Sequence, residues 1–119
     1  MNAGRFDEYN SVNLAALTTA TLLSVQVPGN LRAVITAFAN YVGQTAALGS
    51  IEWRLKINGV ARAPLEAVAD ILGDQAQPWP VEDDRLQAYG GSLIQIEAYN
   101  SHATTAYDVG ARLVGRYER

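Results

Sequence analysis

The chain contains no cysteine. Disulfides, thiolate metal sites and cysteine nucleophiles are therefore excluded, and stability must come from packing and from contacts between subunits. Histidine occurs once, as His102. Multi-histidine metal sites are thus excluded as well, and no partner residues that would complete a catalytic triad with His102 are recognisable. We expect His102 to be an exposed residue of a polar loop between two strands; the alternative is a hydrogen-bonding residue of a binding loop.

An excess of positive charge and a long apolar run are both missing. The 9 Lys and Arg residues against 12 Asp and Glu residues give a net charge of -3, which does not attract phosphate backbones, so we expect no nucleic-acid partner. The apolar stretch 14–27 is threonine-rich and shorter than the ~20 residues of a membrane span, and Asp7 and Glu8 offset Arg5 upstream of it. We expect neither a signal peptide nor a membrane span.

Motifs that would hold a cofactor are also lacking. The glycines have neither the Rossmann nor the Walker spacing. Glu82, Asp83 and Asp84 are too close in sequence to converge on one glycosidic bond. With Asp70 and Asp74 they offer oxygen ligands for Ca²⁺, but without the alternating spacing of a calcium loop. The sequence predicts no catalytic residue, no cofactor and no metal, so we interpret the chain as a binding or assembly protein and not an enzyme.

The composition and the residue pattern of the chain predict one domain rich in strands. Its 119 residues are 49% hydrophobic, enough for one ordinary core. Apolar and polar residues alternate over 50–58 and 107–117, which is typical of strands with one buried face. Segment 92–100 has a partly apolar outer face, and segment 32–42 is apolar on both faces. Segment 32–42 is suited to the middle of a sheet or to a subunit contact, and the outer face of 92–100 adds an apolar patch that association would cover.

Turn signals separate these segments. Asn58-Gly59 predicts a type I′ hairpin, Pro28-Gly29 a type II turn after a strand over 22–27, and Gly90-Gly91 a turn before the strand at 92–100. Residues 64–73 have helical spacing between Pro64 and Gly73, so one short helix is expected there. We predict an all-β fold, a β-sandwich or jelly roll with at most one short helix.

Residues 1–20 show no clean periodicity, and we interpret them as an N-terminal arm beside a sandwich domain of residues 21–119. Phe6 and Tyr9 in this arm, and Trp79 between two prolines, are the predicted partner-binding residues. The alternatives are an arm that forms an edge strand, and a Trp79 that caps the sandwich or stacks on a sugar. Arg112, Arg116 and Arg119 form either an anion-binding stripe or a solvated face.

The layout from Leu22 to Tyr117 resembles the small jelly-roll proteins of tailed-bacteriophage virions, especially capsid decoration (cement) proteins. The resemblance is carried by VPG at 27–29, by IEWRLKING at 51–59 and by YGGSLIQIEAYN at 89–100. It implies a structural virion protein on the capsid surface, a homotrimer that binds and stabilises the shell made by the major capsid protein. The alternative is a carbohydrate-binding or receptor-binding jelly-roll module of a phage tail or fibre, because such layouts serve several functions.

Overall fold

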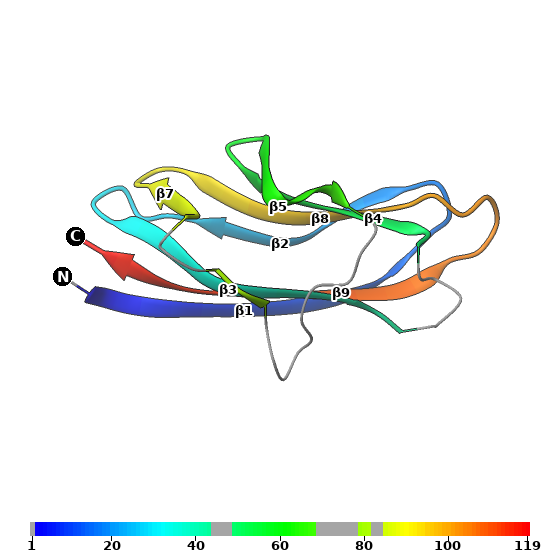
Figure 1. Cartoon of the computed structure of the whole chain (residues 1–119), viewed down its shortest axis with the longest axis horizontal. Helices are drawn as coiled ribbons and strands as arrows, with labels where there is room; N and C mark the ends of the chain where they lie inside the picture. Colours follow the sequence, from blue (N-terminus) through cyan, green and yellow to red (C-terminus); the bar gives the residue numbers. More distant parts are fainter. Residues whose placement is uncertain (1, 44–48, 69–78, 82–84) are drawn as a thin grey trace.

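The chain is an all-β sandwich of two antiparallel sheets packed face to face (Figure 1). The computed structural model describes residues 2–43, 49–68, 79–81 and 85–119, with the backbone alone described for 2, 3, 63–68 and 79. The strands within these ranges are β1 Asn2–Leu14, β2 Thr19–Gln26, β3 Arg32–Val42, β4 Ile51–Ile57, β5 Val60–Val68, β6 Trp79–Pro80, β7 Gln87–Tyr89, β8 Leu93–Asn100 and β9 Tyr107–Glu118.

Strands from opposite ends of the chain pair with each other in both sheets. Sheet A has the order β1-β9-β3, and the short strands β6 and β7 both pair with the remaining edge of β3. Sheet B has the order β2-β8-β4-β5. Because β1 pairs with β9, the two ends of the chain lie at the same end of the sandwich (Figure 1). Most strand pairs therefore close long loops, which is typical of slowly folding β proteins.

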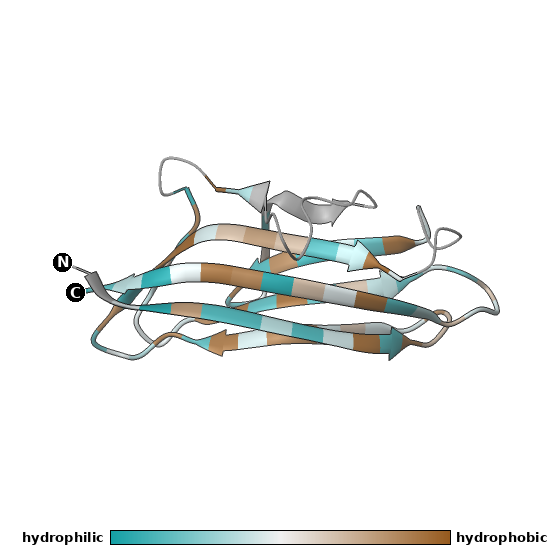
Figure 2. Ribbon diagram, turned by 90° about the horizontal axis from the view of Figure 1, so that it is seen from below, coloured by the Kyte–Doolittle hydropathy of each residue, from teal (hydrophilic) through white to brown (hydrophobic). Residues whose placement is uncertain are grey.

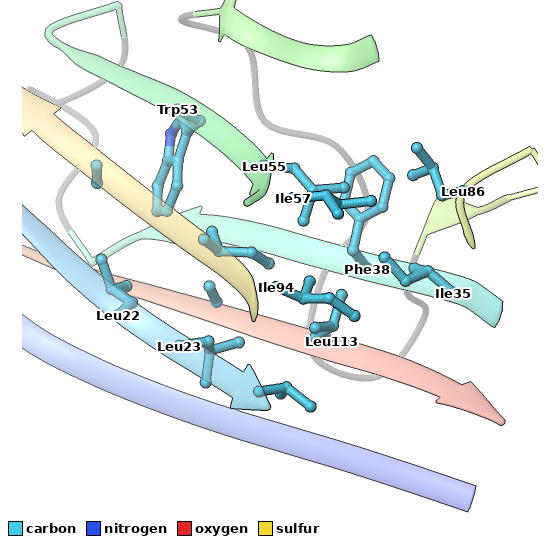
Figure 3. Close-up of a cluster of buried hydrophobic side chains, with 14 of the residues drawn as sticks. Leu22, Leu23, Ile35, Phe38, Trp53, Leu55, Ile57, Leu86, Ile94 and Leu113 are labelled. Atoms are coloured by element: carbon cyan, nitrogen blue, oxygen red, sulfur yellow. The ribbon is translucent and has the colours of Figure 1, made fainter. Parts of the chain in front are cut away.

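The predicted strand periodicities are confirmed. Every second side chain of β4 is buried, and β8 alternates in the same way. Brown and teal alternate along the strands in Figure 2 for this reason. The buried set fills the space between the sheets, where Phe38, Trp53 and Leu113 are fully inaccessible (Figure 3). One hydrophobic core thus holds both sheets, as expected for a single domain.

Of two predicted turns, one is confirmed and the other is wrong. Asn58 and Gly59 have φ of 52° and 81°, the conformation of a type I′ hairpin between β4 and β5, so that prediction is confirmed. The type II turn at Pro28-Gly29 is wrong. The amide of Leu31 donates to the carbonyl of Pro28, which makes Gly29 and Asn30 the central residues, and neither has the positive φ of a type II turn.

The short helix predicted over 64–73 is also wrong in its first half. Residues 64–68 belong to β5, which pairs with β4 through Glu66 opposite Arg54 and Val68 opposite Trp53. The pairing with β4 decides the conformation of this segment over its helical spacing. Residues 69–73 lie outside the described part of the chain.

The position of β3 within sheet A accounts for its apolar residues on both faces. It lies between β9 and the short strands β6 and β7, so its prediction as a middle strand is confirmed. Val34 and Ala39 alternate with the core-facing residues, yet both are 0% exposed in the single chain. The apolar second face of β3 therefore does not by itself require a neighbouring subunit.

The arm predicted for residues 1–20 is instead part of the sandwich. Residues 2–14 are β1, the edge strand of sheet A, and 19–26 are β2. Phe6 and Leu14 are buried in the core, but Glu8 and Asn10, which occupy inward positions between them, are exposed. At the edge of a sheet, polar side chains at inward positions can turn to solvent. Such residues interrupt the apolar–polar alternation of β1, so its sequence shows no clean period of two.

Candidate functional site

The outer face of sheet A, the face turned away from sheet B, has the most distinctive chemistry among the described residues. Alternate residues of β1 point to this face, and all of them are exposed: Arg5, Asp7, Tyr9, Ser11 and Asn13. Their partners across the strand pair are Arg116, Val114, Arg112, Gly110 and Asp108 of β9. Aromatic and charged side chains thus share one open sheet surface.

A pair of tyrosines lies at the centre of this face. The rings of Tyr9 from β1 and Tyr41 from β3 are within 3° of parallel, with centroids 6.2 Å apart, and their hydroxyl groups hydrogen-bond to each other. Tyr9 is 44% exposed. The pair reaches over β9 at Gly110, where an added Cβ would lie 2.3 Å from the Tyr41 ring. Only glycine leaves room for the ring in this position, so Gly110 is part of the site.

The environment of Tyr41 makes its hydroxyl a weak acid. Burial, and next to it the hydrogen bond with Tyr9, raise the pKa of Tyr41 to about 12. The Tyr41 hydroxyl therefore stays protonated at neutral pH, where it can donate and accept a hydrogen bond. The pair offers a partner an uncharged, partly apolar surface with polar tips, the kind of surface that recurs at binding interfaces.

Paired charges border the tyrosines on one side. Arg112 donates from Nε and Nη2 to the two carboxylate oxygens of Asp7, at 2.9 and 2.7 Å. These hydrogen bonds hold the pKa of the Asp7 carboxyl below its usual value, although partial burial opposes them. On the other side, Asn13 donates to Asp108 at 2.9 Å. Planar hydrogen-bonding groups thus flank the aromatic pair at both ends, and Arg112 is not a free member of an anion-binding stripe.

His102 occupies a different region, the loop between β8 and β9. Its Nδ1 accepts the backbone N–H groups of Thr104 and Thr105 at 3.1 and 3.0 Å, and its ring meets Tyr107 edge-on at 5.7 Å. Its side chain is half-buried. His102 therefore stabilises the conformation of its own loop through hydrogen bonds, and a role of this loop in binding stays a prediction.

Asn100 holds this loop to the neighbouring turn. Its side chain is 0% exposed, donates to the carbonyls of Leu14 and Thr105 at 3.1 and 2.9 Å, and accepts the backbone N–H of His102. Its backbone also pairs with Leu17 and Thr18 of the turn between β1 and β2. One buried amide therefore connects two loops at the same end of the sandwich.

The three predicted partner-binding residues do not form one site. Phe6 is only 6% exposed and packs against Tyr117 with ring centroids 5.0 Å apart, so its prediction as an exposed anchor is wrong. Tyr9, three residues further along β1, is exposed on the opposite face of the sheet. The backbone of Trp79 pairs with Phe38 of β3, whereas its side chain lies outside the described part of the structure.

The described residues offer no metal site. Within ranges 2–43, 49–68, 79–81 and 85–119, no group of three or more His, Cys, Asp or Glu side chains could hold an ion. The acidic residues weighed as calcium ligands, Asp70, Asp74, Glu82, Asp83 and Asp84, lie outside these ranges. Within the same ranges, no helix is long and apolar enough to cross a membrane.

Comparison with known proteins does not assign a family. No protein-family model matches the chain, and no curated protein matches it significantly. Arguments about function therefore rest on the site itself.

Sequence reasoning missed Tyr41, Gly110 and the pairing of Arg112 with Asp7. One signal was present: a glycine inside an otherwise regular strand often marks a close approach by another group. The identity of that group depends on the register of β3 and β9, which places Tyr41 directly opposite Gly110. The Asp7–Arg112 pair joins residues 105 positions apart, a separation that no local pattern reveals.

Proposed function

We propose that this chain is a structural virion protein, a capsid decoration protein that binds and stabilises the phage shell as a homotrimer. The observation that carries the proposal is the tyrosine pair on the outer face of sheet A, in which Tyr9 is 44% exposed and Tyr41 half-buried. Tyrosine and arginine are enriched at protein contacts, where a ring supplies apolar area and its hydroxyl finds a polar partner. In this proposal the tyrosine pair contacts the major capsid protein.

The strand order supports the jelly-roll part of the proposal. If β6 and β7 count as one interrupted strand, the successive pairs are β1 with β9, β2 with β8, β3 with β6 and β7, and β4 with β5. Two four-stranded sheets connected in this way are the arrangement of a jelly roll, which occurs in capsid and lectin domains. The order therefore favours a virion or lectin function without choosing between them.

The proposal includes no catalysis and no cofactor. The tyrosine hydroxyls bond to each other, and the Asp7 carboxylate is held by Arg112, so neither group is placed to activate a nucleophile. We expect His102→Ala to fold and to leave any hydrolytic activity unchanged. A glycosidase or esterase activity that is present in the parent and lost in this variant would contradict a structural role.

Co-sedimentation with empty capsid shells tests the proposed function. We expect the chain to pellet with the shells at micromolar concentration, to saturate, and to raise the temperature at which the shells disrupt. Free sugars should not release it. A chain that stays in the supernatant at all concentrations would contradict the proposal.

A glycan-binding tail or fibre module is the second candidate, and the flanks of the tyrosine pair favour it. Asp7, Arg112, Asn13 and Asp108 place planar hydrogen-bonding groups beside exposed aromatic rings, a combination suited to sugar hydroxyls above an aromatic surface. Elution from shells or cells by one specific glycan would decide for this candidate. Binding that is indifferent to every glycan, together with shell binding, would decide for decoration.

A further inference from the structure

Three arginines gather on the outer face of sheet A at the end where β1 begins and β9 finishes. Register places Arg5 of β1 opposite Arg116 of β9, and Arg32 of β3 opposite both Glu118 of β9 and Tyr89 of β7. We call these residues, Arg5, Arg32, Arg116, Glu118 and Tyr89, the arginine end. They span four neighbouring strands on the face that carries Tyr9 and Tyr41.

One carboxylate, that of Glu118, contacts two of the three arginines of the arginine end. Arg32 donates to Oε2 of Glu118, and Arg116 donates from Nε to Oε1 of the same carboxylate at 2.9 Å. These two hydrogen bonds hold the pKa of the Glu118 carboxyl below its usual value and use both of its oxygens. The five residues thus hold three guanidinium groups and one carboxylate in a chain whose net charge is -3. Arg5 has no ion pair among the described residues.

Two features of the arginine end are unfavourable in the free chain. Arg5 and Arg116 form a cross-strand pair of like charges, which destabilises a sheet. The Nε atom of Arg32 is buried and has no hydrogen-bond partner, and a buried donor without an acceptor costs free energy. An anionic group bound at this end would reduce the repulsion between Arg5 and Arg116.

We propose that the arginine end binds a carboxylate-rich patch on the surface of a partner protein. Guanidinium groups match carboxylates through paired parallel hydrogen bonds. Tyr89, 72% exposed beside Arg32, adds the aromatic contact that is common at protein interfaces. With strands about 4.8 Å apart, four strands extend over about 14 Å, which suits several carboxylates better than one small anion.

This inference rests on the proposed function, because the shell protein is the partner in question, and it adds the chemistry of the contact. It does not require the homotrimer. Electrostatic contacts of this kind steer association and weaken as salt is added.

The first test uses the full chain and a fluorescent oligo-glutamate peptide, with binding measured by fluorescence anisotropy at low salt. Arg5→Glu should weaken binding about ten-fold or more, because it reverses an exposed charge at the site. Arg62→Glu is the matched control, since it makes the same charge change at an exposed position of β5 in sheet B, and it should change affinity less than about two-fold. Absence of peptide binding, or equal effects of the two variants, would overturn the inference.

Inorganic phosphate distinguishes a carboxylate patch from a small anion. At equal ionic strength, phosphate and chloride should displace the peptide to the same extent; stronger displacement by phosphate would mean a small-anion site and overturn the inference. Shell binding that Arg5→Glu leaves unchanged would also overturn it, while the proposed function would stand. Peptide binding without any shell binding would support the arginine end and contradict the proposed function.

Discussion

The absence of a Cβ atom at Gly110 leaves room for the ring of Tyr41 in the tyrosine pair. An added Cβ at this position would lie 2.3 to 2.4 Å from two ring atoms and the hydroxyl oxygen of Tyr41. We expect Gly110→Ala to displace the ring and lower the free energy of unfolding by ~1 to 3 kcal/mol, the usual cost of overpacking. Urea unfolding measures this change.

Gly29→Ala is the matched control for this variant. A Cβ at Gly29 meets nothing within 4 Å, and its φ lies outside the left-handed region. This variant should be neutral or more stable by up to ~1 kcal/mol, because alanine restricts the unfolded chain. Equal losses at both glycines would mean that the contact with Tyr41 does not decide the effect.

The tyrosine pair also predicts a pH dependence. The pKa of Tyr41 is raised to about 12, whereas an unfolded tyrosine titrates near its model value of 10.0. The unfolded state therefore loses its proton first, so this contribution to stability is complete below pH ~10 and is lost as pH rises toward ~12. Tyr9→Phe should lower the pKa of Tyr41, since it removes the hydrogen bond but leaves most of the burial. Phenolate absorbance during alkaline titration measures the shift, and an unchanged Tyr41 pKa in Tyr9→Phe would contradict the contact.

Among the elements, β1 has the role that differs most from expectation. Phe6 is 6% exposed, and its ring lies where a Cβ at Gly115 would stand. Phe6→Ala should therefore lower the free energy of unfolding by ~3 to 5 kcal/mol, the range for a buried phenylalanine. The matched variant Tyr9→Ala, on the exposed face of the same strand, should cost less than ~1 kcal/mol. Comparable melting temperatures for the two variants would mean that β1 is not part of the core.

Deleting residues 2–12 extends this test to the whole strand. The truncated chain loses the edge strand of sheet A and uncovers Gly115 and Tyr117, so we expect it to melt at a much lower temperature or fail to fold. A truncated chain with the parent's melting temperature would restore the interpretation of residues 1–20 as a separate arm.

The strands were predictable from local pattern, whereas their partners were not. Alternation in β4 and β8 reports one buried face, and Asn58-Gly59 reports the conformation of its own turn. The tyrosine pair, the Asp7–Arg112 pair and the arginine end each join segments far apart in the sequence. They depend on strand order and register, which no short window contains. The same reasoning explains the error at 64–68, where pairing with β4 outweighs local helical spacing.

On the scale of the whole molecule, the chain is expected to associate. Tyr9 and Tyr89 are large hydrophobic side chains exposed on the same face of sheet A. We predict a stable homo-oligomer, a homotrimer in the proposed function, by sedimentation equilibrium at micromolar concentration. A single species at the 12.8 kDa mass of one chain would contradict this prediction. The two-sided pattern of β3 no longer supports association, because its outer residues Val34 and Ala39 are already buried within one chain.

The most direct test of the account compares the shell affinity of Tyr9→Ala and Val60→Ala. Both residues are exposed hydrophobics, 44% and 59% accessible, but Tyr9 lies on the outer face of sheet A and Val60 begins β5 in sheet B. If the tyrosine pair is the contact, Tyr9→Ala should weaken co-sedimentation with empty shells by about thirty-fold, a loss of about 2 kcal/mol, while Val60→Ala changes it less than about two-fold. Both variants should keep the parent's melting temperature within a few degrees. Equal shell affinity of the parent and Tyr9→Ala would contradict the central claim that this chain binds through the outer face of sheet A.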